Sequence, residues 1–329
     1  MSERVGVVDI GSNSVKLLVL EGNDTLHRDS VVTRLGSGLT GRAGGRTLLA
    51  SSVDATVTRL GEIRGLLDSY GVGETHAVAT AAVRTASNAD DFIAAARDAL
   101  RCDITMIDGV TEGCLSFVGA QHNLSLPAAD TAITVLDIGG GSTEFSVGSP
   151  AGTPRVVSIP FGARNLSERI LRHDPPRPEE LTNAIGAVVD EVDDVVRDIP
   201  DIESCESFVG VAGTIVTIAM VELGLKEFDA TTLHGMRLTR EAAEDVFRTL
   251  ATESMADRVF NPGLPADRAD IIVGGCCVLV AVLRALKLSE ITVSTTALAD
   301  GVATIARHHA GRLRGGDPLA AVLRDCFPQ

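Results

Sequence analysis

Two stretches of this sequence decide its fold: VVDIGSNSVKLLV at residues 7–19 and VLDIGGGSTEFSV at residues 135–147. Aligned without gaps, they are identical at six of 13 positions, which include an Asp-Ile-Gly run and a serine three residues after its glycine. Each stretch has the pattern of a buried strand, a glycine-containing turn and a second strand. Because each opens one half of the chain, we infer two copies of a single strand–turn–strand unit.

Short aliphatic strands and amphipathic helices alternate through the rest of the chain. Strands are expected near residues 4–10, 15–20, 29–34, 76–80, 104–107, 132–137, 143–147, 155–159, 207–211 and 290–294. Helices are expected after an N-cap at Ser51 or Ser52, and over 89–101, 181–199, 240–253, 269–286 and 297–310. This alternation predicts an α/β fold with sheets covered by helices. The loop at 124–130 separates an expected first domain, 1–127, from a second, 128–329, whose last helix can pack back on the first.

Composition and charge narrow the classes of partner. The chain has 329 residues, of which 45% are hydrophobic and 22% charged, a balance typical of a folded globular protein. Its 29 Lys and Arg against 44 Asp and Glu give a formal net charge of −15, which argues against a general nucleic-acid binder. With nine Phe, one Tyr and no Trp, no stacking platform for bases or sugars is evident. An anionic substrate in a local pocket of backbone amides and a few cations is compatible with this composition.

The cysteines and apolar segments indicate a cytoplasmic protein with reduced thiols. None of the six cysteines forms a C-x-x-C pair, so we expect buried thiols rather than a zinc site or disulfides. Residues 1–9 carry charges and lack the apolar core of a secretory signal. The most apolar stretch, residues 271–283, is shorter than a membrane span. We therefore expect no membrane partner, and the sequence is compatible with a homodimer.

The repeated turn has the chemistry of a phosphate and metal site. An aspartate that ends a buried strand, here Asp9 or Asp137, lies beside the amides of a glycine turn, which form a nest for anions. The carboxylate can hold a divalent cation together with phosphate oxygens, an arrangement that magnesium favours. One such turn would fit a structural β-turn equally well, but two favour a phosphate clamp. Further polar contacts to phosphate are expected from Ser12, Asn13, Ser14, Lys16, Ser142 and Thr143.

A third glycine turn, GVAGT at residues 210–214, lies between an expected strand and an apolar helix. Gly213 and Thr214 would then begin a helix whose N-terminal amides can bind an anion. Taken alone, such a turn more often marks a helix that packs closely on a sheet.

Together these motifs resemble those of the acetate kinase, sugar kinase, heat-shock chaperone and actin superfamily. They are most similar to one branch, the exopolyphosphatase and guanosine pentaphosphate phosphohydrolase (Ppx/GppA) family in its short two-domain form. The segments that carry the resemblance are VVDIGSNSVKLL (7–18), RLGSGL (34–39), ATAAVRTASN (79–88), IDGVTEG (107–113), LDIGGGSTEF (136–145), IPFGARNL (159–166), GVAGTIVTIA (210–219), RADIIVGG (268–275) and TALADG (296–301). The family fold implied is α/β, with two actin-like (ribonuclease H-like) domains and an active-site cleft between them.

The resemblance also implies roles for individual residues. Glu112 matches the glutamate that acts as base on, or orients, the attacking water, which suits hydrolysis of a phosphoanhydride. Arg84 matches an arginine expected to neutralise a phosphate, and Arg34 is a second candidate for that role. Metal contacts are expected from Asp9, Asp137 and Glu144. Phosphate contacts are expected from Ser12, Asn13, Ser14, Lys16, Arg84, Gly139, Gly140, Gly141, Ser142, Thr143, Gly213 and Thr214.

Three departures from the family pattern concern the strength of substrate binding. Lys16 stands where relatives often have arginine, which keeps the charge but loses the two-pronged geometry of a guanidinium. Thr111, Gly113 and Cys114 replace residues of the usual E-E-A-R run. Ala299 stands at a position that usually carries a basic residue.

The resemblance implies a magnesium-dependent hydrolase, with manganese as a substitute, that releases terminal orthophosphate from inorganic polyphosphate. Two alternatives stay open: hydrolysis of the 5′ γ-phosphate of guanosine pentaphosphate and, in a different class, a nucleotide-binding kinase or actin-like scaffold. Glu112 favours water as the phosphoryl acceptor. The chain stops 329 − 301 = 28 residues after TALADG, whereas longer relatives prolong the polyphosphate channel, so we expect a preference for short chains and distributive cleavage.

Overall fold

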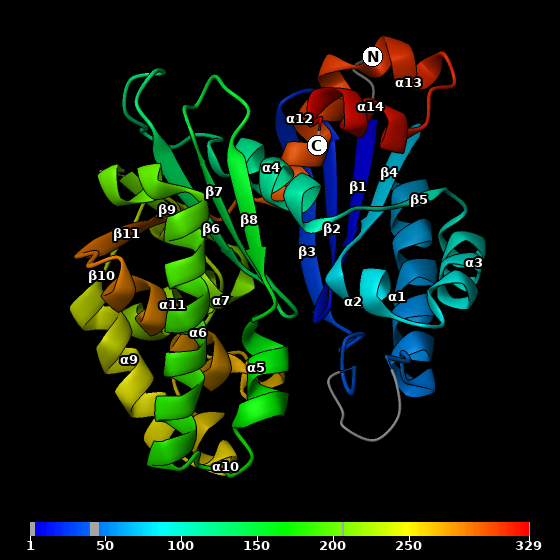
Figure 1. Ribbon diagram of the computed structural model, residues 1–329. Coiled ribbons are helices and arrows are strands. Elements are labelled where there is room, and N and C mark those ends of the chain that lie inside the picture. The colour runs from blue at the N-terminus through cyan, green and yellow to red at the C-terminus, as the bar shows by residue number, and fades with distance from the viewer. Residues whose placement is uncertain (1–3, 40–45, 206, 329) are drawn as a thin grey trace. The chain divides into compact units, whose positions relative to one another are not determined.

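Two mixed β-sheets with covering helices make up the computed structural model, which describes residues 4–39, 46–205 and 207–328 (Figure 1). The chain divides into unit 1, which consists of Met1–Gly119 and Leu298–Gln329, and unit 2, which consists of Ala120–Ala297. The boundary expected at 127/128 thus lies shortly beyond the end of unit 1. Residues from Leu298 onward return to unit 1, because the helix that begins there packs on the first sheet.

Unit 1 contains a sheet in the order β3-β2-β1-β4-β5. Its strands are β1 (Arg4–Ile10), β2 (Ser14–Glu21), β3 (Asp24–Val32), β4 (Glu74–Ala79) and β5 (Ile104–Met106). Its helices are α1 (Ala50–Ser69), α2 (Ala81–Thr85), α3 (Ala89–Leu100), α4 (Gly109–Ala120), α12 (Leu298–His308), α13 (Ala310–Arg314) and α14 (Leu319–Cys326). β1, β2 and β3 pair antiparallel, whereas β4 and β5 run parallel to β1.

Unit 2 contains a sheet in the order β10-β11-β9-β6-β7-β8. Its strands are β6 (Ile133–Ile138), β7 (Thr143–Gly148), β8 (Arg155–Ile159), β9 (Ser207–Val211), β10 (Arg237–Thr239) and β11 (Glu290–Val293). Its helices are α5 (Ala163–Ile170), α6 (Pro178–Asp198), α7 (Ala212–Leu223), α8 (Ala230–Leu233), α9 (Arg240–Thr252), α10 (Met255–Arg258) and α11 (Ile272–Ala285), with short 3₁₀ turns η1 (Pro200–Ser204) and η2 (Ala266–Arg268).

The two sheets repeat one strand plan. In unit 1, the antiparallel strands β2 and β3 lie on one side of β1, and the parallel strands β4 and β5 lie on the other. In unit 2, the antiparallel strands β7 and β8 lie on one side of β6, and the parallel strands β9 and β11 lie on the other. Equivalent residues flank the first turn of each plan: Asp9 is opposite Lys16, and Asp137 is opposite Glu144. The duplication predicted from the repeated sequence is therefore confirmed, as is the α/β class. Unit 2 adds β10, which pairs antiparallel with β11 at the sheet edge.

Each unit has a hydrophobic core of its own. In unit 1, aliphatic residues of the sheet such as Val8, Ile10 and Leu17 belong to one cluster with Leu60 and Ile63 of α1. Their spacing explains the local structure, because alternate strand positions and positions three apart on a helix each face one side. The cores hold the strands that end at the two glycine turns.

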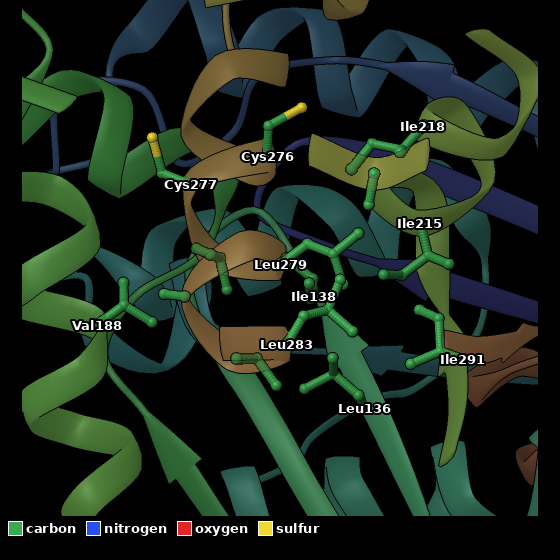
Figure 2. Packing of buried hydrophobic residues seen from close by; sticks show 14 of the residues in the cluster. Leu136, Ile138, Val188, Ile215, Ile218, Cys276, Cys277, Leu279, Leu283 and Ile291 are labelled. Carbon is green, nitrogen blue, oxygen red and sulfur yellow. The ribbon is translucent and has the colours of Figure 1, made fainter. Parts of the chain in front are cut away.

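The centre of unit 2 is α11, whose residues from Ile272 to Leu283 are all buried. It contacts α5, α6, α7 and α9, so apolar side chains are needed on every side of it. Figure 2 shows Leu279 and Leu283 of this helix in the same cluster as Leu136 of β6. Among the described residues, no helix is long and apolar enough to cross a membrane.

The cysteines are free thiols, as predicted. The buried ones are Cys114, Cys205, Cys276 and Cys277, whereas Cys102 and Cys326 are partly exposed. Burial is the main cause that raises the pKa of the Cys114 thiol, and also that of Cys277, to about 12. Both thiols therefore stay protonated and unreactive at neutral pH.

The start of α1 differs from the prediction. The N-cap predicted at Ser51 or Ser52 is wrong, because α1 begins at Ala50 and has no side-chain cap. Just before it, Leu48 is buried and its N–H donates to Asn88 Oδ1 (2.9 Å). This long-range contact fixes the chain ahead of the helix and outweighs the local capping preference.

Candidate active site

The first glycine turn joins β1 to β2 in unit 1. Gly11 N–H donates to Ser14 O (3.0 Å) and closes the turn. N–H groups within residues 33–36, after β3, donate to Asn13 O and Ser12 O at distances of 2.7 to 3.0 Å. The carbonyls of the turn are therefore held by the segment that follows the hairpin.

The second glycine turn, in unit 2, is built in the same way. Gly139 N–H donates to Ser142 O (3.0 Å), and the N–H groups of residues 163–164 donate to Gly139 O and Gly140 O, both at 2.9 Å. The support is so close that a Cβ on Gly162 would lie 2.6 Å from Gly140 C, so this position requires glycine. Here the segment after β8 and the start of α5 hold the turn.

These tethered carbonyls decide where the amides of the turns point. A trans peptide directs its C=O and its N–H in opposite directions. Because the carbonyls of Ser12, Gly139 and Gly140 accept from the supporting segments, the N–H groups of Asn13, Gly140 and Gly141 are directed to the opposite side. Neighbouring amides with one direction form a nest that binds an anion such as phosphate.

Side chains of unit 2 reinforce the second turn. The Thr143 hydroxyl donates to Phe161 O (2.6 Å), and the Thr143 side chain is fully buried. The Asn165 side-chain amide donates to Gly141 O and to Pro160 O. Thr143, expected from sequence at the phosphate, lies here on the supporting side of the turn.

In unit 1 the two charged residues beside the turn form an ion pair. Lys16 Nζ lies 2.9 Å from Asp9 Oδ2, and Asp9 is only 3% exposed. The sequence assigned Lys16 to a phosphate and Asp9 to a metal. Because each charge is compensated by the other, this turn presents amides and hydroxyls rather than a net negative charge.

The equivalent pair in unit 2 is acidic on both sides. Asp137 and Glu144 are buried and directly opposite in register, so their side chains lie on the same face of the sheet. Glu144 Oε1 accepts a hydrogen bond from the Ser158 hydroxyl (2.8 Å). Carboxylate oxygens, completed by water and phosphate oxygens, suit magnesium. This pair therefore fits a divalent cation better than Asp9 does.

A metal site made of protein ligands alone is not formed within the part of the chain that the structure describes. Among those residues no group of three or more His, Cys, Asp or Glu is placed to hold an ion. Two carboxylates beside an anion nest leave coordination positions for water and phosphate oxygens, which is the usual way in which magnesium is held with phosphates.

Glu112 lies in the first turn of α4, held by an arginine. Asp108 caps this helix, because its Oδ1 accepts from Thr111 N–H (2.7 Å) and its carbonyl accepts from Glu112 N–H (2.9 Å). Arg84 Nη1, on α2, donates to Glu112 Oε2 (3.2 Å) and to Ile107 O (2.7 Å). The Glu112 side chain is 12% exposed, so a positioned carboxylate with limited access to solvent results.

The third glycine turn, between β9 and α7, has a residue with positive φ and an arginine side chain packed against its glycine. Ala212 has a positive φ of 70°, and a Cβ on the next residue, Gly213, would lie 2.3 Å from Arg268 Nη1. Burial lowers the pKa of Arg268, although a guanidinium remains charged at neutral pH. Thr214 is buried in the first turn of α7. A cation beside helix N-terminal amides is an arrangement that favours an anion.

Arg268, which lies beside the third glycine turn, is a candidate residue that the sequence did not single out. Its signal was the RADIIVGG segment at 268–275, which contributed only to the resemblance. Arg164, in the IPFGARNL segment that carries the family resemblance, is 5% exposed and paired with Asp270 (3.2 Å) and Glu168 (3.4 Å).

The structure therefore groups the sequence-predicted residues within each unit. Unit 1 brings together the turn residues Ser12, Asn13 and Ser14 with the Asp9–Lys16 pair, and separately Arg84 with Glu112. Unit 2 brings together Asp137, Gly139, Gly140, Gly141, Ser142, Thr143 and Glu144 around the second turn, and Gly213 and Thr214 with Arg268 around the third. That residues of both units act on one substrate stays a prediction.

Two α/β units of one strand plan, each with a glycine turn at the end of its first strand, define a protein of the actin-like fold. Within that class, the chain belongs to the Ppx/GppA phosphatase family, whose model matches residues 12–308, and it is a hydrolase.

Comparison with individual proteins agrees with this assignment. The chain is 30% identical over 319 residues to exopolyphosphatase 2 of Mycobacterium tuberculosis, covering 91% of this chain and 97% of that one. A crystal structure of an exopolyphosphatase-like protein has a TM-score of 0.86 and 28% identity, covering 94% of this chain and 99% of that chain. The crystal structure of an exopolyphosphatase from Cytophaga hutchinsonii has a TM-score of 0.79 and 26% identity, covering 96% and 99%.

Proposed function

We propose that this protein is an exopolyphosphatase, which releases orthophosphate from the end of inorganic polyphosphate by attack of water on the terminal phosphoanhydride. The observation that carries the proposal is the duplicated turn: within each unit its carbonyls are tethered to a supporting segment, so that the N–H groups of Asn13 in unit 1, and of Gly140 and Gly141 in unit 2, are directed away from that segment. Phosphate oxygens are the natural ligands of such nests. Named exopolyphosphatases among the relatives support the substrate class.

In this mechanism the turns bind phosphate and Glu112 acts on water. Amides of Gly140 and Gly141 and the Ser142 hydroxyl hold the terminal phosphoryl group and stabilise the negative charge on its oxygens. The Glu112 carboxylate accepts a proton from the attacking water, which then bonds to phosphorus as the bridging oxygen departs. Arg84 orients Glu112 through one of its five N–H donors, which leaves donors for a phosphate oxygen.

We further propose that a divalent cation, magnesium or manganese, is held by Asp137 and Glu144. A bound cation would neutralise charge on the transferred phosphoryl group. The two carboxylates suit it because they lie on one face, beside the amides that hold the phosphate. Asp9 is assigned a supporting role, since its carboxylate already compensates Lys16. Thr143 is assigned to support of the turn.

The ion pairs of the structure support a preference for short chains. Three cations of the repeated turn and the family motifs are paired with carboxylates: Lys16 with Asp9, Arg84 with Glu112 and Arg164 with Asp270. Long polyanions gain affinity from a continuous track of cations whose charges are not already compensated. We therefore propose that only the terminal few phosphates are bound and that cleavage is distributive.

Guanosine pentaphosphate is the second candidate substrate, because it also presents a terminal phosphoanhydride and the chain belongs to the Ppx/GppA phosphatase family. The test is orthophosphate release by the purified protein with magnesium, from tripolyphosphate, long-chain polyphosphate, guanosine pentaphosphate and ATP. We expect the highest kcat/KM for tripolyphosphate. A kcat/KM at least tenfold higher for guanosine pentaphosphate would assign the alternative function, and release of orthophosphate from none of them would overturn both.

A further inference from the structure

Helices α12 and α4 of unit 1 approach each other at a glycine. A Cβ on Gly301 would lie 2.0 Å from Leu115 O, 2.7 Å from Leu115 C and 3.0 Å from Leu115 Cα. All three atoms belong to the backbone of α4, so no side chain can rotate away to make room. Because real Cβ contacts stay beyond 3.0 Å, an added methyl group would force the helices apart by at least 3.0 − 2.0 = 1.0 Å.

Helix α12 is anchored on its other sides and cannot easily retreat. Asp300 accepts two hydrogen bonds from the Arg28 guanidinium of β3 (3.1 and 2.5 Å) and is only 8% exposed. Leu298, Val302 and Ala303 are buried, and α12 contacts β1, β2 and β4. A side chain at position 301 would therefore displace α4 rather than α12.

Helix α4 carries Glu112, one turn before Leu115. Arg84 Nη1 donates to the Glu112 carboxylate at 3.2 Å, and Arg84 is itself fixed to Ile107 O at 2.7 Å. Displacement of α4 would move Glu112 while the arginine stayed in place. A misplacement of about 1 Å can cost about a hundredfold in rate when a reacting group must be positioned.

We propose that Gly301 is a positioning residue for the reaction: by allowing close contact between α12 and α4, it sets the position of the Glu112 carboxylate. The proposal rests on the function proposed for Glu112. It explains why a glycine is required inside α12, where alanine would otherwise be the better helix former by about 1 kcal/mol.

The test compares Gly301→Ala with Gly61→Ala. Gly61 is exposed on α1 of the same unit, and an added Cβ there meets nothing within 4 Å. Both substitutions gain helix propensity, so only the contact with α4 differs. With tripolyphosphate and magnesium, we expect kcat of Gly301→Ala to fall about 10- to 100-fold with KM within threefold of wild type, and Gly61→Ala to match wild type. A kcat of Gly301→Ala within twofold of wild type overturns the proposal.

A second readout does not depend on activity. Cys114 lies on α4 between Glu112 and Leu115, and it is buried. Alkylation by iodoacetamide, followed by peptide mass spectrometry, should be at least fivefold faster at Cys114 in Gly301→Ala, and unchanged at Cys276 of unit 2. Equal acceleration at both cysteines would show general unfolding and contradict the positioning role.

A third variant covers the case in which Gly301→Ala alone folds poorly. Asp300→Asn weakens the anchor to Arg28, so α12 can yield in the double variant Asp300→Asn/Gly301→Ala. Where both single variants can be assayed, we expect the kcat of the double variant to exceed the value obtained by multiplying the two single effects. Where Gly301→Ala cannot be assayed, we expect the kcat of the double variant to exceed one tenth of the kcat of Asp300→Asn. Multiplicative loss would overturn the proposal. Glu112→Gln separates the two hypotheses. If it stays active, the proposed role of Glu112 as base fails, whereas an inactive Glu112→Gln beside a fully active Gly301→Ala defeats only the positioning role of Gly301.

Discussion

Replacing Glu112 by glutamine removes the proposed proton acceptor and little else. A glutamine oxygen can still accept the 3.2 Å hydrogen bond from Arg84 Nη1, so α2 and α4 keep their contact. A general base typically contributes about 10²–10⁴ in rate, which corresponds to about 2.7–5.4 kcal/mol of barrier at about 1.36 kcal/mol per factor of ten. We therefore expect kcat to fall by about 10²–10⁴, with KM nearly unchanged because the glycine turns are untouched.

The effect on stability should be small by comparison. Exchanging an ion pair for a neutral hydrogen bond at this partly exposed position costs about 0.5–1.5 kcal/mol. Unit 1 has 119 + 32 = 151 residues, and for such a size each kcal/mol shifts Tm by about 2–4 °C. The expected loss is thus about 1–6 °C, far too little to explain a hundredfold loss of turnover at 25 °C.

The assay is steady-state release of orthophosphate from tripolyphosphate, run beside thermal unfolding of the same preparation. Glu62→Gln is the matched control, because Glu62 also accepts from an arginine of unit 1, Arg59 (2.9 Å), but is exposed on α1. It should keep kcat within twofold. If Glu112→Gln kept kcat within threefold of wild type, or lost activity only as far as its Tm explained, the assignment of Glu112 as base would be refuted.

Three further predictions concern the proposed metal ligands, the second glycine turn and the Glu180 carboxylate. Asp137→Ala should raise the magnesium concentration needed for half-maximal activity at least tenfold. Asp9→Ala should raise it less, because Asp9 already pairs with Lys16. Equal magnesium requirements of the two variants would contradict the assignment of the metal to Asp137 rather than Asp9. Gly162→Ala should raise KM at least tenfold by pushing on the second turn, whereas Gly186→Ala, which has open space on α6, should not; the ratio of the two KM values decides. Although burial opposes ionisation of Glu180, hydrogen bonds from His173 and from the backbone N–H groups of residues 172, 173 and 177 lower its pKa to about 2 from 4.5. The stability that this carboxylate adds is full above pH about 4.5 and is lost as pH falls toward about 2, so Glu180→Gln should be less stable at pH 7 and show a flatter acid unfolding curve by circular dichroism.

The fold could be predicted where local sequence decides it. The Asp-Ile-Gly runs at 9–11 and 137–139 place a strand end and a turn in the same few residues, and both turns form as expected. The bounds of β8 and β9, Arg155–Ile159 and Ser207–Val211, are the same as those expected from the sequence. The start of α1 could not be predicted, because it depends on a contact between Leu48 and Asn88, 40 residues apart.

The candidate site was predictable in its turns but not in its ion pairs. Amide nests need only glycines at a strand end, which a sequence displays directly. The pairing of Lys16 with Asp9 depends on the register of a hairpin, which places residues seven apart opposite each other. Arg268 reaches Gly213 across 268 − 213 = 55 residues, and no spacing rule connects them. Cations were therefore assigned to phosphate although neighbouring carboxylates already compensate several of them.

Whether water attacks the terminal phosphoanhydride of polyphosphate is tested most directly by the fate of solvent oxygen. Tripolyphosphate and magnesium are incubated with the protein in water enriched in ¹⁸O, and the products are analysed by ³¹P NMR. We expect one ¹⁸O atom in each orthophosphate released and none in the pyrophosphate formed at early times. Label in pyrophosphate instead, or phosphoryl transfer to added nucleoside diphosphate with unlabelled products, would contradict this expectation.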